Sequence, residues 1–229
     1  ERLERSFHQT SRFSADAAHE LKTPLTILQG QIERAIFQSD MGSVIQKDLA
    51  LMLDEVQRLD AIVRNLLLFS LADAGQLRLN KCEVDLSLML ANLIEDAQML
   101  APSLTIDGLV AENLVVKADA DLLIQVLHNL LSNAIKYNIP NGWIRIDAKQ
   151  MNNHIEVIVS NSSLGIAEAD LELIFERFYR CESSHNRKVD GMGLGLSLSR
   201  DIIHAHHGKI DVSTDQSAVS FLIHLPLNS

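Results

Sequence analysis

The chain has 229 residues, 47% of them hydrophobic, which is enough for two modest domains with separate cores. Its formal net charge of −10, without any run of Lys and Arg, argues against nucleic acid as a partner. The cysteines at 82 and 181 lack a CxxC or metal-type spacing, which argues against a disulfide framework or a zinc site, and no apolar run approaches the roughly 18 residues needed to span a bilayer.

The first residues, ERLERSF, lack an initiator Met and already look helical, with Leu3 and Phe7 four positions apart. The two widely separated cysteines fit a reducing compartment. We therefore expect the chain to be a soluble piece of a longer protein.

Two long amphipathic helices are predicted in the first 75 residues. Between residues 3 and 37 apolar positions recur at steps of three or four, as in a helix with one buried stripe, at Leu21, Leu25, Leu28, Ile32 and Ile36. Turn residues at 39–43 interrupt this pattern, which resumes from Leu49 to Phe69. Two such helices cannot bury both stripes against each other, so we expect an obligate homodimer that forms a four-helix bundle.

The rest of the chain alternates short strands with helices. A turn at 74–76 and polar residues beyond it predict a linker at 76–85, between a helical-hairpin domain at 1–75 and a second domain at 86–229. Asp119 is an N-cap candidate for a helix at 120–137. Strands are predicted at 115–118, 143–148, 155–160, 209–213 and 217–225. We expect an α/β sandwich with one mixed sheet covered by helices.

The segment AHELKTPL places a histidine on the outward face of the first helix. His19 lies about 180–240° around the helix from the apolar stripe, and Thr23 shares its face. Pro24 removes a backbone hydrogen bond and would bend the helix just beyond His19. The Glu20 carboxylate could accept the Nδ1 proton and make Nε2 a better nucleophile. On spacing alone, an ordinary surface histidine beside an ordinary acid is the simpler explanation.

One face of the predicted helix at 120–137 is polar. Asn129, Asn133 and Lys136 fall within roughly 60° of one another, whereas Leu123, Leu127, Leu130 and Ala134 occupy the opposite side. Amide oxygens are hard ligands and a lysine neutralises phosphate, so this face suits a Mg²⁺-bound triphosphate. The solvated face of an amphipathic helix would show the same pattern.

The segment GMGLGLSLSR, residues 191–200, sets alternating glycines before an apolar helical run. Such glycines let the backbone approach phosphates and direct amides at them from a helix N-terminus, although a glycine pattern alone is weak evidence. The preceding residues 181–190 are polar and irregular, which suits a mobile lid over a ligand. Within them Arg187 and Lys188 could reach phosphate or could equally be solvated charges.

AHELKTPLTIL closely resembles the phosphoacceptor motif of the sensor histidine kinases of two-component systems. The resemblance implies that His19 takes the γ-phosphoryl group of ATP and passes it to an aspartate in the receiver domain of a response regulator. Glu20 would be the general base, and Thr23 would orient water in the reverse, phosphatase direction. RFSADAAHELKTPL is most like membrane-anchored kinases, so we expect the cytoplasmic part of a bacterial inner-membrane protein.

HNLLSNAIKYN resembles the asparagine-rich helix of the Bergerat-type ATP-binding fold that histidine kinases share with Hsp90, gyrase and MutL. This resemblance implies ATP and Mg²⁺ as cofactors, with Asn133 and Asn129 at the metal. The ATPases of that group have a glutamate base where this chain has Asn129. Because an amide cannot activate water, ATP should persist until His19 attacks it.

Three further segments resemble the same family. GMGLGLSLSR resembles its second glycine box, IFERFYR its phenylalanine box, and the His206-His207-Gly208 triplet its turn between helix and strand rather than a metal site. The nucleotide-binding residues implied by the resemblance are Asn129, Asn133, Lys136, Tyr137, Asn161, Gly165, Ile166, Phe178, Arg180, Gly191, Gly193, Leu194, Gly195 and Leu196.

VIVSNSSLGI, residues 157–166, departs from the family pattern. The first glycine box usually reads D-x-G-x-G, and its aspartate accepts a hydrogen bond from the adenine amino group. Here Asn161 takes the place of that aspartate and Ser163 that of the first glycine, so only Gly165 remains. A neutral acceptor in place of a charged one should cost about 1–2 kcal/mol, roughly five- to thirtyfold in affinity. Ser163 would be strained if its position requires a positive φ.

From these motifs we expect a protein-histidine kinase with reduced nucleotide affinity. The alternative is a nucleotide-weak pseudokinase that acts as a regulator-binding scaffold or a phosphatase. A free-standing chaperone- or gyrase-like ATPase is disfavoured by the N-terminal hairpin and by Asn129.

Overall fold

The computed structural model describes residues 21–181, 193–215 and 217–227. The chain divides into two compact units, Glu1–Leu77 and Arg78–Ser229. Each unit is described by itself. No helix in the described ranges has the length and apolar character needed to cross a membrane.

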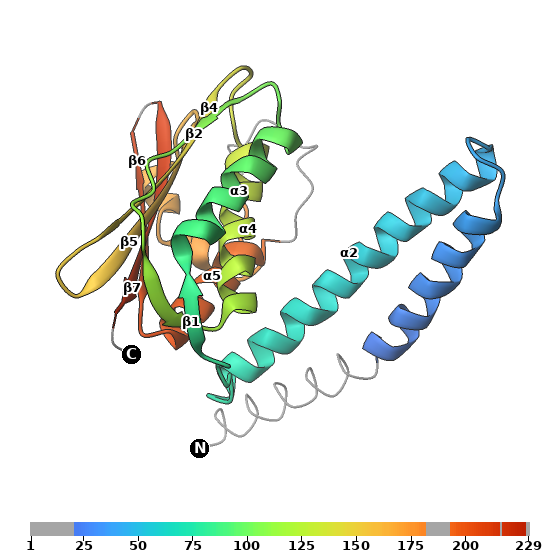
Figure 1. Cartoon of the computed structure of the whole chain (residues 1–229), viewed down its shortest axis with the longest axis horizontal. Coiled ribbons are helices and arrows are strands. Elements are labelled where there is room, and N and C mark those ends of the chain that lie inside the picture. Colours follow the sequence, from blue (N-terminus) through green and yellow to red (C-terminus); the bar gives the residue numbers. More distant parts are fainter. Residues whose placement is uncertain (1–20, 182–192, 216, 228–229) are drawn as a thin grey trace. The chain divides into compact units, whose positions relative to one another are not determined.

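The first unit is a helical hairpin (Figure 1). A helix that covers 21–38 of the described chain is followed by a turn and by α2 (Val44–Asp73). The Ser43 side chain caps α2 by accepting a hydrogen bond from the backbone N–H of Gln46 at 3.1 Å. Gly42, which precedes the cap, has a φ of 77°, a conformation that glycine adopts readily. Ser43 and Gly42 therefore account for the turn that the sequence predicts.

The hairpin buries only part of its apolar surface. Ile32, Val56 and Val63 are buried, whereas Leu21 and Leu28 of the predicted stripe are exposed. The pattern fits an element that needs a further apolar surface.

The second unit contains two sheets. Five strands in the order β2-β4-β5-β7-β6 form the main sheet, in which β2 runs parallel to β4 and all other neighbours are antiparallel. A separate antiparallel pair joins β1 to β3. The strand bounds are β1 (Cys82–Asp85), β2 (Thr105–Asp107), β3 (Val115–Ala118), β4 (Trp143–Gln150), β5 (His154–Ser162), β6 (Lys209–Thr214) and β7 (Ala218–Pro226).

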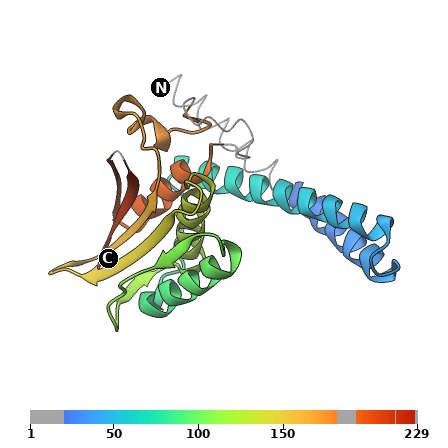
Figure 2. The ribbon, with the colours of Figure 1, turned by 90° about the horizontal axis from the view of Figure 1, so that it is seen from above.

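Three α-helices cover one face of the main sheet (Figure 2). They are α3 (Leu86–Leu100), α4 (Ala120–Lys136) and α5 (Gly195–Ala205). The covered face is recognisable in β5, where the odd-numbered Ile155, Val157 and Val159 are buried and the even-numbered residues before Ser162 are only half-buried. The core lies between these odd-numbered side chains and the apolar faces of the helices.

The predicted fold class, a helical hairpin followed by an α/β sandwich, is confirmed. Every predicted strand is present, and most extend one or two residues beyond the predicted ends. The expectation of one sheet is wrong, because β1 and β3 form a second one. Strand β1 also occupies 82–85 of the predicted linker and belongs to the second unit.

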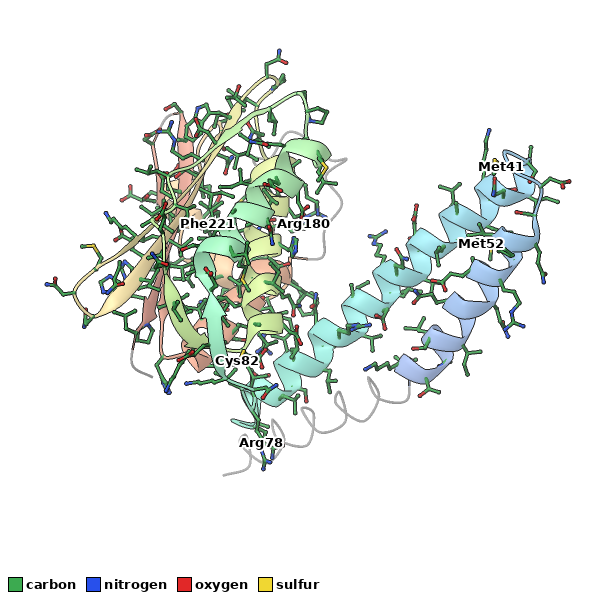
Figure 3. All side chains as sticks on the ribbon, viewed as in Figure 1. Met41, Met52, Arg78, Cys82, Arg180 and Phe221 are labelled. Carbon is green, nitrogen blue, oxygen red and sulfur yellow. The ribbon has the colours of Figure 1, made fainter. Side chains whose placement is uncertain are left out.

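Other elements were missed by the periodicity. Helix α3, capped by the Asp85 side chain, was not predicted, although Leu86, Leu90, Leu93 and Ala97 recur at helical spacing and are buried. The short strands β1 and β2 were not predicted either. Between Ile166 and Phe175 the chain forms two single 3₁₀ turns, η1 (Glu168–Asp170) and η2 (Leu173–Phe175). The ring of Phe175 packs edge-on against Phe221 of β7, labelled in Figure 3, with centroids 6.4 Å apart.

Candidate functional site

Helix α4 presents the predicted polar face. Asp119 caps the helix by accepting a hydrogen bond from the N–H of Leu122 at 3.1 Å. The four residues predicted to face the core are all buried: Leu123, Leu127, Leu130 and Ala134. On the other side the candidate residues are accessible, since Asn129 and Asn133 are half-buried and Lys136 and Tyr137 are exposed.

Asn129 connects α4 to the first turn of α5. Its Nδ2 donates to the carbonyl oxygen of Gly195 at 3.3 Å and lies 3.4 Å from the hydroxyl of Ser199. These two contacts use the amide nitrogen. The amide oxygen of Asn129 is therefore the atom that a metal ion or its water shell could contact.

The glycine-rich segment packs directly on the backbone that follows η2. The Phe178 N–H donates to the carbonyl oxygen of Gly193 at 2.9 Å. Gly193 has a φ of 70°, and a Cβ there would lie 2.6 Å from the Tyr179 carbonyl oxygen, so only glycine fits. Phe178 itself has a φ of 64° and is 60% exposed. This contact joins two described segments of the chain, one on each side of residues 182–192.

Ion pairs also connect the phenylalanine-rich segment with α5. Arg177 lies 3.3 Å from Asp201, and Arg200 lies 3.5 Å from Glu176. These four residues were not predicted from the sequence. The opposite charges in IFERFYR and SLSRD are the signal that could have indicated the two ion pairs. Together they fix the position of the segment that carries Arg180, an exposed residue labelled in Figure 3.

Tyr179, near the end of IFERFYR, forms a second contact, with Asp170 of η1. The Tyr179 hydroxyl donates to the Asp170 carboxylate at 2.7 Å. Burial, and secondarily the negative charge of Asp170, raises the pKa of the Cys181 thiol. The raised pKa favours the protonated thiol over the nucleophilic thiolate.

Asn161 continues the buried, odd-numbered face of β5, opposite Ile144 on one side and Val219 on the other. It is only 3% exposed. Its Nδ2 donates to the backbone carbonyl oxygen of Ser162 at 2.9 Å. The amide oxygen is therefore the atom that can accept a hydrogen bond from a ligand.

A compact hydrogen-bond network supports the strand at this point. The Ser162 hydroxyl donates to Asn138 Oδ1 at 2.6 Å and accepts from the Trp143 N–H at 2.8 Å. Asn138 Nδ2 in turn donates to the carbonyl oxygens of Ala134 and Trp143. A Cβ on Gly142 would lie 2.1 Å from both Asn138 Oδ1 and Ser162 Oγ. Sequence reasoning missed this network because its partners are 4 to 24 positions apart and come from different elements.

The turn after β5 needs a single glycine. Gly165 has a φ of 84°, and a Cβ there would lie 2.9 Å from the Asp215 carbonyl oxygen. Ser163 is not among the described residues with positive φ, so the strain considered for it is not present. Its hydroxyl instead accepts from the Gly165 N–H at 3.3 Å. Ile166 is fixed by its N–H, which donates to Thr214 Oγ1 at 3.2 Å.

His206 has a structural role, as its place in the turn predicts. It is 1% exposed; its Nδ1 donates to the Ile202 carbonyl oxygen at 2.8 Å, and its Nε2 accepts from the Asp119 N–H at 2.9 Å. Burial lowers the pKa of the imidazole, which keeps it neutral. A neutral ring with this tautomer ties the end of α5 to the start of α4.

Several predicted site residues lie outside the described residues: His19, Glu20 and Gly191, with Arg187 and Lys188 of the loop. Thr23 is described and is exposed on the first helix. Of the second glycine box, Leu194 is buried, and Gly195 and Leu196 begin α5.

Two family models match the chain. "His Kinase A (phospho-acceptor) domain" covers residues 9–75, and "Histidine kinase-, DNA gyrase B-, and HSP90-like ATPase" covers residues 118–229. Among curated proteins, the Probable sensor protein PcoS of Escherichia coli is 36% identical over an alignment of 229 positions that covers 98% of this chain and 48% of that protein. The chain thus spans about half the length of the curated relatives it matches.

Solved structures give the same result. The Acinetobacter baumannii histidine kinase AdeS is 30% identical, with a TM-score of 0.64 over 92% of this chain and 98% of that one. Histidine kinase ThkA, solved in complex with response regulator protein TrrA, is 28% identical, with a TM-score of 0.63 over 100% of this chain and 65% of that one.

Proposed function

We propose that this chain, which belongs to the sensor histidine kinase family, uses ATP to phosphorylate His19 and then donates the phosphoryl group to an aspartate of a response regulator. The chain carries the phosphoacceptor and ATP-binding domains of that family. The activity, its cofactor geometry and its partners are our inference from the site.

The proposal rests on two hydrogen bonds, one at each end of the polar face of α4. At one end Asn129 is bound to Gly195 of the glycine box. At the other, Asn138 is bound to Ser162, the neighbour of Asn161. Between Asn129 and Lys136 lies roughly 10 Å of helix, at a rise of 1.5 Å per residue. In the proposal, Asn161 supplies the adenine acceptor and residues 129–136 of α4 supply the phosphate-binding stretch, and these two hydrogen bonds support the two groups.

Each end of the nucleotide has a matching group. Asn161 Oδ1 would accept a hydrogen bond from the adenine amino group, with the turn at Gly165-Ile166 beside the base. At the other end, α5 begins at Leu194-Gly195 without a side-chain cap, so phosphate oxygens could bind the N–H groups of its first turn. A Cβ on Gly195 would make only ordinary contact with Asn129. The packing of the protein therefore does not require glycine at this position. A phosphate that approaches the backbone closely would be a reason for glycine there.

The charge of the phosphates would be met by Lys136, Arg180 and a magnesium ion. Asn133 and Asn129 supply amide oxygens, which suit Mg²⁺. When bound, the ion would neutralise phosphate charge during phosphoryl transfer. Tyr137, Phe178, Gly193 and Leu196 border this part of the site in the proposal, together with Gly191 outside the described residues.

In the reaction, Nε2 of His19 attacks the γ-phosphorus and the bond to the β-phosphate oxygen of ADP breaks. Glu20 accepts the hydrogen bond from Nδ1–H and holds the ring in the reactive tautomer. Asn129 lacks a basic carboxylate, so water is not activated in competition with His19. Thr23, exposed on the first helix, would orient water when the phosphoryl group is removed from the regulator.

We further propose that the hairpin forms a homodimeric four-helix bundle and that the chain is the cytoplasmic part of a membrane-anchored bacterial sensor. The exposed Leu21 and Leu28 of the hairpin support dimerisation. The resemblance of RFSADAAHELKTPL to membrane-anchored kinases supports the second point.

Nucleotide titration tests the proposal. ADP and ATP with Mg²⁺ should bind the chain saturably, and Asn133→Ala should weaken binding of ATP·Mg²⁺. Ser160→Ala, on the uncovered face of β5, is a matched control that should leave binding unchanged. An absence of binding at millimolar nucleotide would rule out the active kinase.

One observation favours a second function, because Asn161 replaces the acid that the family uses to read adenine. A chain that binds no nucleotide but still binds a receiver domain would be a pseudokinase scaffold or a phosphatase acting through Thr23.

A further inference from the structure

Three side chains with metal-ligand chemistry meet on the second unit, away from the elements assigned to nucleotide. They are His154 and Glu156 of β5 and His224 of β7, and their ligand atoms all lie within 4.8 Å of one another. Glu156 pairs directly with His224 across the two antiparallel strands. The two imidazole rings are tilted at 58° with centroids 4.8 Å apart. The cluster therefore comes from strand register rather than from a loop.

The cluster is on the opposite face of the sheet from the proposed nucleotide site. Side chains alternate along a strand, and Asn161 shares the helix-covered face with odd-numbered residues. His154 and Glu156 have even numbers and lie on the other face. Binding of magnesium and ATP at α4 therefore does not explain why these three residues lie together.

The hydrogen-bond partners of the cluster favour metal binding. Asn153 Oδ1 lies 3.1 Å from His154 Nδ1, a contact that places the proton on Nδ1 and leaves the Nε2 lone pair available. His224 Nε2 lies 3.6 Å from Glu156 Oε2. The Lys149 ammonium lies 2.8 Å from the other carboxylate oxygen, Oε1. The contacts with Asn153 and Lys149 thus orient the His154 ring and the Glu156 carboxylate within the cluster.

We propose that His154, Glu156 and His224 bind one divalent late transition-metal ion such as Zn²⁺ or Ni²⁺, with water in the remaining positions. Two imidazoles and a carboxylate suit these ions, whereas Mg²⁺ prefers oxygen ligands alone. Bonds of about 2.0–2.2 Å put donors on one zinc roughly 3–4 Å apart. The ligand atoms, now within 4.8 Å of one another, need to close by about an ångström through side-chain rotation.

Lys149 is the competing cation of this site. It pairs with Glu156 and is 59% exposed, so it can move away when a metal binds, but its charge opposes the dication. Lys149→Met should therefore tighten metal binding. If the cluster only stabilised the sheet, removing the Lys149–Glu156 ion pair would not strengthen metal binding.

The test is calorimetric titration of the whole chain, without nucleotide, with ZnCl₂ and with NiCl₂. Wild type should bind one ion that is lost in both His154→Ala and His224→Ala, weakened in Glu156→Gln, and tightened in Lys149→Met. Asn153→Ala should weaken it about tenfold or more, as expected when the group that orients a ligand is removed. His204→Ala, an exposed histidine on α5, is the matched control and should retain the ion.

Because a variant could bind less metal simply by misfolding, circular dichroism and ADP binding are measured on each one. Both should be unchanged in the histidine variants, which also separates this proposal from the proposed kinase function. No saturable site in wild type overturns the proposal. Binding that survives in both His154→Ala and His224→Ala also overturns it, because the ion would then be held elsewhere.

Discussion

The Ser162 hydroxyl donates a 2.6 Å hydrogen bond to Asn138 Oδ1 and, on its other side, accepts from the Trp143 N–H. Ser162→Ala would leave both groups without this partner in a position that is 2% exposed. The substitution should destabilise the second unit by about 1–3 kcal/mol, the usual cost of unsatisfied buried polar groups. Trp143 is the only tryptophan, so urea unfolding followed by its fluorescence measures this directly.

Ser160→Ala is the control for that substitution. It deletes the Ser160 hydroxyl, which is two residues away on the same strand and contacts the Ser220 hydroxyl at 2.8 Å. The loss of stability should be smaller than for Ser162→Ala. Ser162→Ala should also weaken ADP binding because Asn161 is its neighbour. Equal effects of the two substitutions would show that the Ser162 network does not position the strand.

Asn161→Asp should tighten adenine nucleotide binding by roughly five- to thirtyfold, since a charged acceptor replaces a neutral one. The same change should lower the stability of the nucleotide-free chain. The buried carboxylate would lose the donor bond to the Ser162 carbonyl oxygen and face that oxygen instead. Titration with ADP measures the first effect and urea unfolding the second, with Asn161→Ala as the variant expected to bind more weakly. An unchanged affinity in Asn161→Asp would mean that another group reads adenine.

Gly165→Ala should destabilise the second unit by at least about 1–2 kcal/mol, because its φ of 84° is in the left-handed region and a Cβ would meet the Asp215 carbonyl oxygen. Trp143 fluorescence during urea unfolding again provides the measurement. Gly30→Ala is the opposite control: the residue is in a helix with no atom within 4 Å of the added Cβ. It should stabilise the hairpin by about 0.5–1 kcal/mol, measured by circular dichroism.

Stability should fall in acid because of His206. Burial lowers its folded-state pKa, so as pH falls below the usual value of about 6.5 the unfolded chain takes up a proton before the folded chain does. The contribution is complete above that pH and is lost as pH falls toward the lowered folded-state pKa. His206→Gln should flatten the dependence of unfolding free energy on pH between 7 and 5, whereas His204→Gln should preserve the wild-type slope. A wild-type slope retained in His206→Gln would assign the effect to another group.

Local periodicity explains what the sequence could predict. Helix α4 shows its two faces because Leu123, Leu127 and Leu130 recur every three or four residues, and β7 shows alternation over nine. The Asp119 cap was predictable because its partner is three residues away.

Contacts between distant segments explain what the sequence could not predict. His206 meets Asp119 across 87 positions, and Arg177 meets Asp201 across 24. No local pattern pairs His206 with Asp119, and the opposite charges of Arg177 and Asp201 indicate an ion pair only once their segments are known to be adjacent. The contacts that support the candidate site therefore became visible only in the fold. The polar face of α4 was thus predictable, but the bonds that connect it to Gly195 and Ser162 were not.

The central claim is that His19 is phosphorylated by ATP bound at the α4–α5 site, and radiolabel transfer tests it most directly. Incubation with γ-labelled ATP and Mg²⁺ should label the wild-type chain through an acid-labile, base-stable bond, and should leave His19→Gln unlabelled while ADP affinity stays unchanged. His204→Gln should be labelled like wild type. Label that persists in His19→Gln, or a wild-type chain that binds ATP but takes up no label, would contradict the account.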